Sequence, residues 1–227
     1  MEILFLGTGA ADWPKDKDIH SFSEYRRNAS ALIDDVLLID PGPFAYDAVH
    51  TFGGDAKTIK YIINTHKHDD HYNISTIEKL EKAGARFIPM EKGQTVTLGK
   101  YTVRALEAHH GTVQDAVHFL ISDGTSRMFY GLDGAWLLYD EVQAIKEAPV
   151  DFAVLDATVG FIEGDYRVFE HNNLHMVIEM KKALAPHVKR FCISHMAYTL
   201  HTDHKTLASD MEKYGIEVAY DGMETDF

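Results

Sequence analysis

Apolar positions along the chain form short runs rich in β-branched and aromatic residues, and turn-forming residues bound each run. Runs of this kind predict β-strands. The segment 30–40 is typical of a hairpin that turns at Asp34 and Asp35 and ends at the breaker Pro41-Gly42-Pro43. We expect further strands in the segments 2–9, 59–65, 95–108, 117–123, 127–133, 151–156, 190–194 and 216–222.

Apolar residues three or four positions apart predict helices between these strands. In 73–83, Ile74, Ile77 and Leu80 share one face, with Asn73 suited to the N-cap and Gly84 to the C-terminal stop. The other predicted helices are a segment at 139–148, one with Leu174, Val177, Ile178 and Leu184 that ends by Pro186, and one with Leu207, Met211 and Tyr214 that ends at Gly215. Strands that run early and late with helices interspersed predict an α/β or α+β protein with layered sheets.

Composition narrows the classes of partner. A length of 227 residues suits one large domain, and we treat 1–227 as a single unit. The formal net charge is −13 and no basic stripe is present, which argues against a long nucleic acid as partner. No apolar run approaches the roughly 20 residues of a membrane span. The opening run ends at Gly7 without a basic segment before it, which is typical of a strand and not of a signal peptide.

Histidine is the unusual residue, with 14 copies against the single Cys192. One cysteine excludes internal disulfides and cysteine-based zinc clusters, and with the features above it favours a cytoplasmic location. The segment "NTHKHDDH", residues 64–71, follows a predicted strand. Side chains at i and i+2 of a strand point the same way, so we expect His66 and His68 to share a face. A bend into the next helix would bring Asp70 and His71 back to the same place. This spacing predicts a site for two neighbouring metal ions, with Asp69 outside it.

The motif "THKHDDH" resembles the H-x-H-x-D-H signature of the metallo-β-lactamase superfamily, and the resemblance extends over almost the whole chain. It implies a four-layer αβ/βα sandwich of two mixed sheets with helices on the outer faces. "FLGTGA" near the start resembles the branch that contains tRNA 3′-end processing enzymes and small phosphodiesterases. "LLIDPG" resembles the second strand of the family, which implies that Asp40 is a carboxylate that orients a histidine ligand.

The resemblance also implies a set of metal ligands. "EAHHGT" offers His109 and His110, and the family pattern favours His110. "FYGLDGA" supplies Asp133 in the bridging position, "CISHMA" supplies His195, and "LDAT" places Asp156 in the family's acidic position outside the ligand shell. The implied ligands are His66, His68 and His110 for one metal, Asp70, His71 and His195 for the other, and Asp133 between the two. Nitrogen and oxygen ligands suit two divalent ions, Zn²⁺ or Mn²⁺.

His171, in "FEHNNLHM", resembles a histidine of the phosphodiesterase branch that lies outside the metal shell beside the leaving group. The closing stretch "VAYDGMET" resembles the cyclic phosphate phosphodiesterases of the carbon–phosphorus lyase pathway. Those enzymes carry extra zinc-binding cysteines near the N-terminus, and this chain has none there. We therefore expect no accessory structural zinc, and the substrate stays open.

Together these features predict a dinuclear metal-dependent hydrolase, with a small anionic phosphodiester, linear or cyclic, as substrate. The resemblance implies a metal-bridging hydroxide as nucleophile, with His171 as general acid; His171 and Asp70 are the catalytic candidates. The alternatives are a lactonase or other carboxyl-ester or amide hydrolase on the same metals. Less favoured are tRNA 3′-end processing, against which the acidic chain argues, and a non-catalytic metal-binding module.

Several residues stay open at this point. His175, His201 and His204 have no assigned role, with substrate contact as one option, although 201–204 is most typical of a loop and helix cap. Trp13 and Tyr25 are interpreted as partly buried surface-loop residues, with a substrate lid as the alternative. The sequence does not decide between a monomer and a homodimer.

Overall fold

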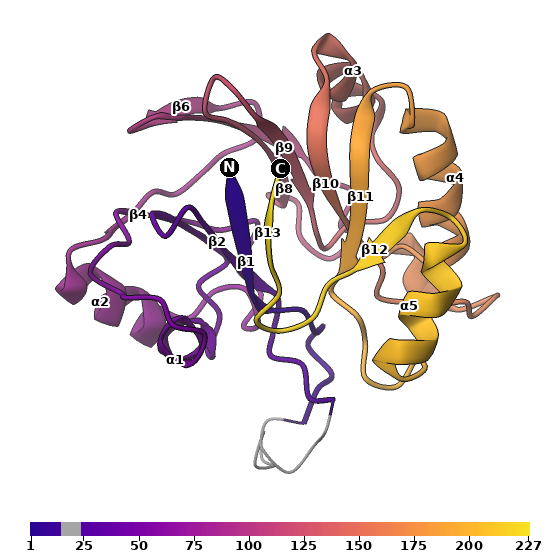
Figure 1. Ribbon diagram of the computed structural model, residues 1–227, viewed down its shortest axis with the longest axis horizontal. Helices are drawn as coiled ribbons and strands as arrows, with labels where there is room; N and C mark the ends of the chain where they lie inside the picture. The colour runs from indigo at the N-terminus through magenta and orange to yellow at the C-terminus, as the bar shows by residue number, and fades with distance from the viewer. Residues whose placement is uncertain (15–23) are drawn as a thin grey trace.

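The computed structural model describes residues 1–14 and 24–227, whose strands form two mixed sheets that pack face to face (Figure 1). The first sheet has the order β13-β1-β2-β3-β4-β5, with β1 (Glu2–Gly7), β2 (Ser30–Ile33), β3 (Leu37–Ile39), β4 (Tyr61–Ile63), β5 (Arg86–Phe87) and β13 (Glu224–Asp226). The second has the order β12-β11-β10-β9-β8-β7-β6, with β6 (Thr95–Leu98), β7 (Tyr101–Glu107), β8 (Val117–Ser122), β9 (Arg127–Gly131), β10 (Val150–Asp156), β11 (Val188–Ser194) and β12 (Ile216–Val218).

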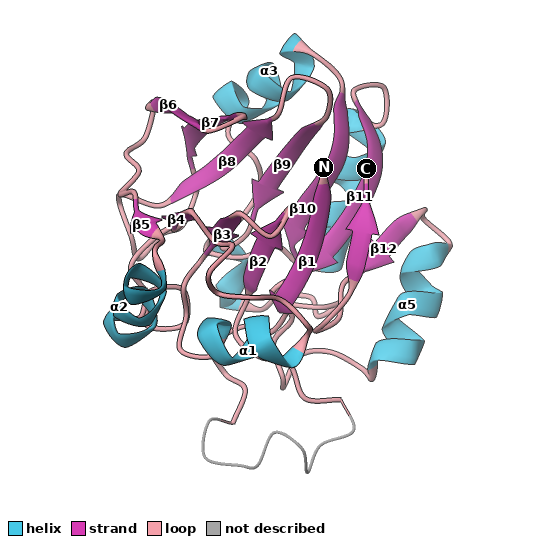
Figure 2. Cartoon of the chain, turned by 60° about the vertical axis from the view of Figure 1, so that its left-hand side comes forward, coloured by secondary structure: helices cyan, strands magenta, loops and turns pink. Residues whose placement is uncertain are grey.

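Helices cover the outer face of each sheet. The helices α1 (Ala45–Thr51) and α2 (Ile74–Ala83) pack on the first sheet, and α3 (Tyr139–Glu147), α4 (Leu174–Leu184) and α5 (His204–Glu212) pack on the second. Figure 1 shows the two groups of helices on opposite sides, with both chain ends side by side between them, and Figure 2 distinguishes the helices from the strands by colour. The layers are therefore helix, sheet, sheet and helix, as predicted.

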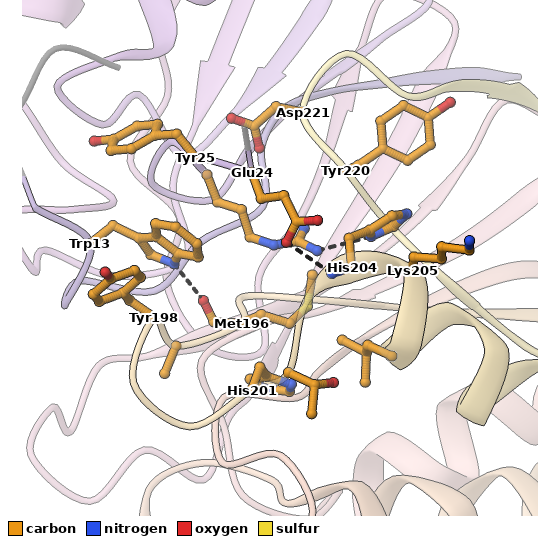
Figure 3. Close-up of a pocket in the computed structure, with 14 residues that line it drawn as sticks. Trp13, Glu24, Tyr25, Met196, Tyr198, His201, His204, Lys205, Tyr220 and Asp221 are labelled. Atoms are coloured by element: carbon orange, nitrogen blue, oxygen red, sulfur yellow. Dashed lines mark hydrogen bonds between the residues drawn. The ribbon is translucent and has the colours of Figure 1, made fainter. Parts of the chain in front are cut away.

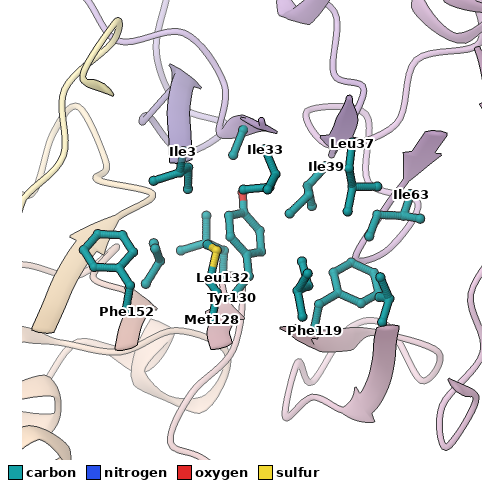
Figure 4. Packing of buried hydrophobic residues seen from close by; sticks show 14 of the residues in the cluster. Ile3, Ile33, Leu37, Ile39, Ile63, Phe119, Met128, Tyr130, Leu132 and Phe152 are labelled. Carbon is teal, nitrogen blue, oxygen red and sulfur yellow. The ribbon is translucent and has the colours of Figure 1, made fainter. Parts of the chain in front are cut away.

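The core has three parts because most strands are buried on both faces. In β1, Ile3 and Phe5 belong to the central cluster between the sheets, whereas Leu4 and Leu6 pack under the helices of the first sheet. This alternation follows from the two-residue period of a strand, and it explains why the run is apolar throughout. Figure 4 shows the central cluster, in which the aromatic rings of Phe119, Tyr130 and Phe152 from the second sheet face isoleucine and leucine side chains of the first.

The hairpin and the helix ends lie where the sequence predicts them. Asp34 and Asp35 have φ angles of 45° and 57°, as the tight turn between β2 and β3 requires. Asn73 caps α2 by accepting a hydrogen bond from the Thr76 N–H, and Gly84 ends the helix in a left-handed conformation. Asp203 caps α5 in the same way, so the segment 201–204 is the loop and cap that its sequence suggests.

Some expectations are wrong. Ile74 is 61% exposed, because the buried face of α2 consists of Thr76, Ile77 and Leu80. Tyr214 lies beyond the end of α5 and is 40% exposed. The strands β5 and β13 and the helix α1 were not predicted; each is short, so its periodicity is weak.

Within the described residues, no helix has the length and apolar character needed to cross a membrane.

Candidate metal centre

The predicted ligands lie at one edge of the two-sheet sandwich. Strands β7, β9, β10 and β11 run in the same direction, so their carboxyl ends meet at that edge. His110 follows β7, Asp133 follows β9, and His195 comes directly after β11. The segment 66–71 lies between β4 and α2 and supplies the ligands from the first sheet. The fold therefore gathers residues more than 120 positions apart in the sequence.

Three residues of this edge have left-handed backbone conformations. Asp40, Asp133 and His195 have φ angles of 58°, 63° and 62°. Side chains other than glycine adopt such angles at a cost of about 1–3 kcal/mol, and they do so most often at functional sites. The turn after each strand thus directs a carboxylate or an imidazole toward the same centre.

One group of potential ligands contains His66, His68, His110 and Asp133, with one donor atom of each within 4.8 Å of the others. The Nε2 atom of His110 lies 3.2 Å from Nδ1 of His68, and Nε2 of His66 lies 3.0 Å from Oδ2 of Asp133. His109 is exposed and directs its Nδ1 atom at a carbonyl oxygen, so the structure brings His110 and not His109 into the group.

The reason for this arrangement differs from the predicted one. His66 and His68 lie beyond the end of β4, and His109 and His110 lie beyond the end of β7. The alternation of side chains along a strand therefore does not orient them. Loop conformation does so, and the His66 and His68 rings meet edge to face at 4.5 Å.

A second group contains Asp70, His71, Asp133 and His195. The Nε2 atoms of His71 and His195 are 3.1 Å apart, and Oδ2 of Asp70 lies 3.3 Å from the same nitrogen of His71. Asp133 also lies 3.1 Å from His71, so its carboxylate belongs to both groups. Asp69 is exposed and outside both.

The donor atoms fit metal ions. Two nitrogens each about 2.0–2.1 Å from a tetrahedral zinc lie roughly 3.3 Å apart, close to the imidazole pairs described here. Within the described residues, Nε2 of His66 and Oδ1 of Asp133 are buried and make no hydrogen bond. Nε2 of His66 lies 3.0 Å from Oδ2 of Asp133, and Oδ1 of Asp133 lies 3.0 Å from Nδ1 of His171. Buried polar atoms of this kind are satisfied by a cation. We therefore regard both groups as suited to divalent metal.

Burial and charge set the protonation of the ligands. Burial lowers the pKa of His66, and it lowers the pKa of His110 to about 4. Both rings are thus in the neutral form that binds metal. Burial alone would lower the pKa of His195 too, but the carboxylates of Asp133 and Asp156 outweigh burial and raise that pKa to about 9. Metal binding to the second group therefore displaces protons.

Both ligand carboxylates stay ionised. Burial raises the pKa of the Asp70 and Asp133 carboxyls, but the His71 and His195 rings outweigh this effect and hold both pKa values well below their usual range.

Two further carboxylates contact predicted ligand histidines on the ring nitrogen that faces away from the metal groups. Oδ2 of Asp40 lies 3.0 Å from Nδ1 of His71, and Oδ1 accepts hydrogen bonds from the N–H and hydroxyl of Thr65. Asp156 lies 3.2 Å from Nδ1 of His195. Contacts of this kind fix the ring and its tautomer, so that the far nitrogen faces the metal. The structure thus places Asp40 and Asp156 behind ligand histidines.

Sequence reasoning missed Thr158. Its hydroxyl lies 2.7 Å from Nδ1 of His195 and 2.9 Å from Oδ2 of Asp156, so it completes the support of that ring. The residue is part of the "LDAT" stretch two positions after Asp156, and that proximity was the available signal.

His171 lies beside the two ligand groups and, with Asp133, Asp156 and His195, forms a third set of donor atoms within 4.8 Å of one another. Its Nδ1 atom is 3.0 Å from Oδ1 of Asp133 and 3.3 Å from Oδ2 of Asp156. Burial would lower the pKa of His171, but these carboxylates raise it to about 11. His171 and both ligand groups line one cavity of about 260 Å³. His175, one helical turn later, is exposed and lies 3.9 Å from Glu163, away from this cavity.

The two-sheet sandwich is that of the metallo-β-lactamase fold, and the histidine and aspartate residues at its strand ends form groups suited to metal ions. The model of the metallo-beta-lactamase superfamily matches residues 27–73, the segment that carries Asp40 and the histidine motif. No curated protein sequence matches the chain. The predicted resemblance to this superfamily is confirmed by the family match and by the fold.

Solved structures share the fold over the full length. The metallo-beta-lactamase fold protein YhfI from Bacillus subtilis has a TM-score of 0.76 at 15% identity, over 99% of this chain and 98% of that one. A diphosphatase from the PhnP family has a TM-score of 0.75 at 18% identity, over 100% and 97%. Zn²⁺-bound PqqB from Methylobacterium extorquens has a TM-score of 0.74 at 16% identity, over the whole of both chains.

Proposed function

We propose that the protein is a dinuclear metal-dependent phosphodiesterase that acts on a small phosphodiester, linear or cyclic. The observation that carries this proposal is the position of His171. Its ring lies beside both ligand groups, is held by two carboxylates, and borders the cavity in which a substrate would meet the metals. Phosphodiester cleavage releases an alkoxide that needs a proton, and a histidine in this place can supply it.

Each group of donors would hold one divalent ion, with Asp133 shared between them. The first ion would take the rings of His66, His68 and His110, and the second would take Asp70, His71 and His195. When bound, such a pair of ions supplies an activated water as nucleophile and positive charge for the phosphoryl oxygens. Zn²⁺ and Mn²⁺ both suit these nitrogen and oxygen donors.

The residues around His171 determine how it transfers its proton. Nδ1 faces Asp133 and Asp156, so Nε2 is the ring nitrogen that remains to donate a hydrogen to the leaving oxygen. A metal ion on Asp133 would take up part of the charge of that carboxylate. Asp156, which is fully buried and ionised, would then keep the ring oriented and favour its protonated form.

The cavity favours a small anionic substrate. Its volume of about 260 Å³ accommodates a phosphoryl group with little else, and Arg167, whose guanidinium pairs with Asp165, lines its wall. The net charge of −13 disfavours long nucleic acids, which bind through many phosphate contacts. One protein of similar fold is described as a diphosphatase from the PhnP family, which supports phosphorus chemistry as the reaction class.

The test is a panel of three substrates after reconstitution with Zn²⁺ or Mn²⁺: bis(p-nitrophenyl) phosphate, a lactone and a β-lactam. We expect turnover of the phosphodiester, with a kcat/KM at least tenfold above that for the other two. The Asp133→Asn variant serves as the control for metal-dependent turnover. Lactone hydrolysis without phosphodiester hydrolysis would contradict the proposal and favour the carboxyl-ester alternative.

A further inference from the structure

A second cavity, of about 430 Å³, adjoins the metal centre and is lined by aromatic side chains (Figure 3). The rings of Trp13, Tyr25, Tyr198 and Tyr220 come from the loop after β1, the segment before β2, the loop after β11 and the segment after β12. Cavities of this size hold small molecules, and aromatic walls bind planar rings. No step of the proposed reaction uses this cavity.

The aromatic cavity and the metal cavity share a wall. Ala197 lines both cavities, and Met196, which lines the aromatic one, directly follows the predicted ligand His195. Asp12 lines the metal cavity and accepts a hydrogen bond of 2.8 Å from the N–H of Tyr198. The two cavities are therefore direct neighbours.

Hydrogen bonds and ring contacts fix the aromatic wall. The indole N–H of Trp13 donates to the carbonyl oxygen of Met196 at 2.8 Å, which sets the plane of the ring. Its centroid lies 4.9 Å from that of Tyr198 and 5.7 Å from that of Tyr25. A wall that is already ordered costs little entropy when a ligand ring stacks on it.

Polar groups at the margin of the cavity offer both donors and acceptors. The buried Arg26 donates to Nδ1 of His204 at 3.0 Å; because arginine can only donate, Nε2 of His204 carries the hydrogen. The Glu24 carboxylate accepts from the backbone N–H of His204 at 3.3 Å. Such groups match the edge of a heteroaromatic ring, which also mixes donors and acceptors.

The charged side chains of the aromatic cavity balance one another, so this cavity does not favour an anionic group. Arg26 and Lys205 are balanced by Glu24 and Asp221, which line the same space. Asp221 also accepts hydrogen bonds from Thr8 and from the backbone of Arg27, so it stays within the wall. Ring stacking is therefore the main attraction that the cavity offers.

We propose that this aromatic cavity binds the heteroaromatic ring of a nucleotide-like phosphodiester, whose phosphoryl group lies at the metal centre. The position of the phosphoryl group in this proposal rests on the proposed phosphodiesterase function. Stacking on aromatic side chains is tolerant of ring identity, so the cavity accepts purines and pyrimidines alike.

Tryptophan fluorescence tests this proposal. The chain has two tryptophans, and Trp136 lines neither the aromatic nor the metal cavity, so Trp136→Phe leaves Trp13 as the reporter. Adenosine 5′-monophosphate is titrated into the zinc-reconstituted variant, with excitation at the red edge of the indole band. Ribose 5-phosphate, which carries the same phosphate without the ring, is the control ligand. We expect saturable quenching by the nucleotide and none by the sugar phosphate at equal concentration.

A matched pair of tyrosines localises the effect. Tyr198 and Tyr214 are 41% and 40% exposed, but only Tyr198 lines the cavity, so Tyr214 is a control of equal exposure outside it. In the reporter background, Tyr198→Leu is expected to weaken nucleotide affinity about tenfold, as loss of one stacking partner predicts. Tyr214→Leu is expected to leave the affinity unchanged. Equal quenching by both ligands, or equal affinities of the two variants, would overturn the proposal.

Turnover of bis(p-nitrophenyl) phosphate by the same samples separates this proposal from the proposed function. Nucleotide-specific quenching that depends on Tyr198, in a protein without phosphodiester turnover, supports ring binding and contradicts the phosphodiesterase. Turnover without nucleotide-specific quenching contradicts ring binding and leaves the phosphodiesterase intact.

Discussion

The histidines of this chain differ because of the groups around each ring. His66 and His110 are buried and neutral, whereas two carboxylates keep a proton on His171. His175 has the same spacing from His171 as a metal pair on a helix would have, but its side chain is 54% exposed and its neighbour is Glu163. A histidine therefore gains a chemical role here through carboxylates and burial.

The role of His171 can be tested by substitution. We expect His171→Ala to retain both metal ions and to lower phosphodiester turnover about 10²–10⁴-fold, because a general acid contributes a factor of that size. Metal content by elemental analysis and kcat on bis(p-nitrophenyl) phosphate are the measurements. His175→Ala, which changes an exposed histidine nearby, serves as the control and should keep full activity. Full turnover in His171→Ala would rule out the general-acid role.

A second buried histidine affects stability. Nδ1 of His118 lies 2.6 Å from Oε1 of Glu141, and both side chains are 1% exposed. Burial lowers the pKa of His118, but Glu141 outweighs it and raises that pKa above 6.5. The charge of the pair therefore stabilises the fold fully below about pH 6.5, and this contribution is lost as the pH rises through the folded-state pKa.

Glu141→Gln is expected to lower the free energy of unfolding by about 3 kcal/mol at pH 6, since it leaves a buried partner unpaired. The difference from the unsubstituted protein should shrink as the pH rises toward 9. Asp133 and Asp156 also act on His118, and both remain in the variant. Urea unfolding across this range measures the effect, with Glu147→Gln, which removes an exposed carboxylate, as the control. A difference that stays constant with pH would contradict this account.

At the scale of elements, local signals decided what the sequence could predict. The cap Asn73, the stop Gly84 and the turn at Asp34-Asp35 act within a few residues, so the sequence predicted α2 and the first hairpin correctly. The burial of Ile74 depends on which face of α2 meets the first sheet, and periodicity alone does not determine that. The short helix α1 has too few turns for a clear pattern.

The turn after β3 also positions a predicted ligand. A Cβ atom on Gly42 would lie 2.1 Å from the backbone oxygen of Asp70, closer than any real contact. We therefore expect Gly42→Ala to displace Asp70 and lower the affinity for the second metal at least tenfold, which isothermal titration with Zn²⁺ would measure. Gly54→Ala, where a Cβ atom meets the Val49 side chain at 3.0 Å and the Val49 backbone oxygen at 3.2 Å, outside the ligand groups, should leave metal affinity unchanged. Equal affinities of the two variants would show that this close approach does not position Asp70.

At the scale of the whole molecule, the metal groups connect the two sheets. The segment 66–71 follows a strand of the first sheet, whereas His110, Asp133 and His195 follow strands of the second. The local motif could be found in the sequence, but the distant members came from the family resemblance, because spacing alone does not indicate that β7, β9 and β11 end at one edge. The sequence offered Trp13 and Tyr25 only as possible lid residues, because the cavity forms where the start of the chain meets the segments around Tyr198 and Tyr220.

Because the predicted ligands of each ion come from both sheets, metal binding should stabilise the fold as a whole. An ion present at 1,000 times its Kd adds about 4 kcal/mol to the free energy of unfolding. For a chain of this length, one or two such ions raise the Tm by roughly 10–30 °C. Calorimetry with excess Zn²⁺ and with a chelator measures the difference. His195→Ala should lose about half of the shift, because it removes a ligand of the second ion only, whereas the exposed His50→Ala should keep all of it. Equal Tm values with metal and with chelator would mean that the two sheets are not joined through bound metal.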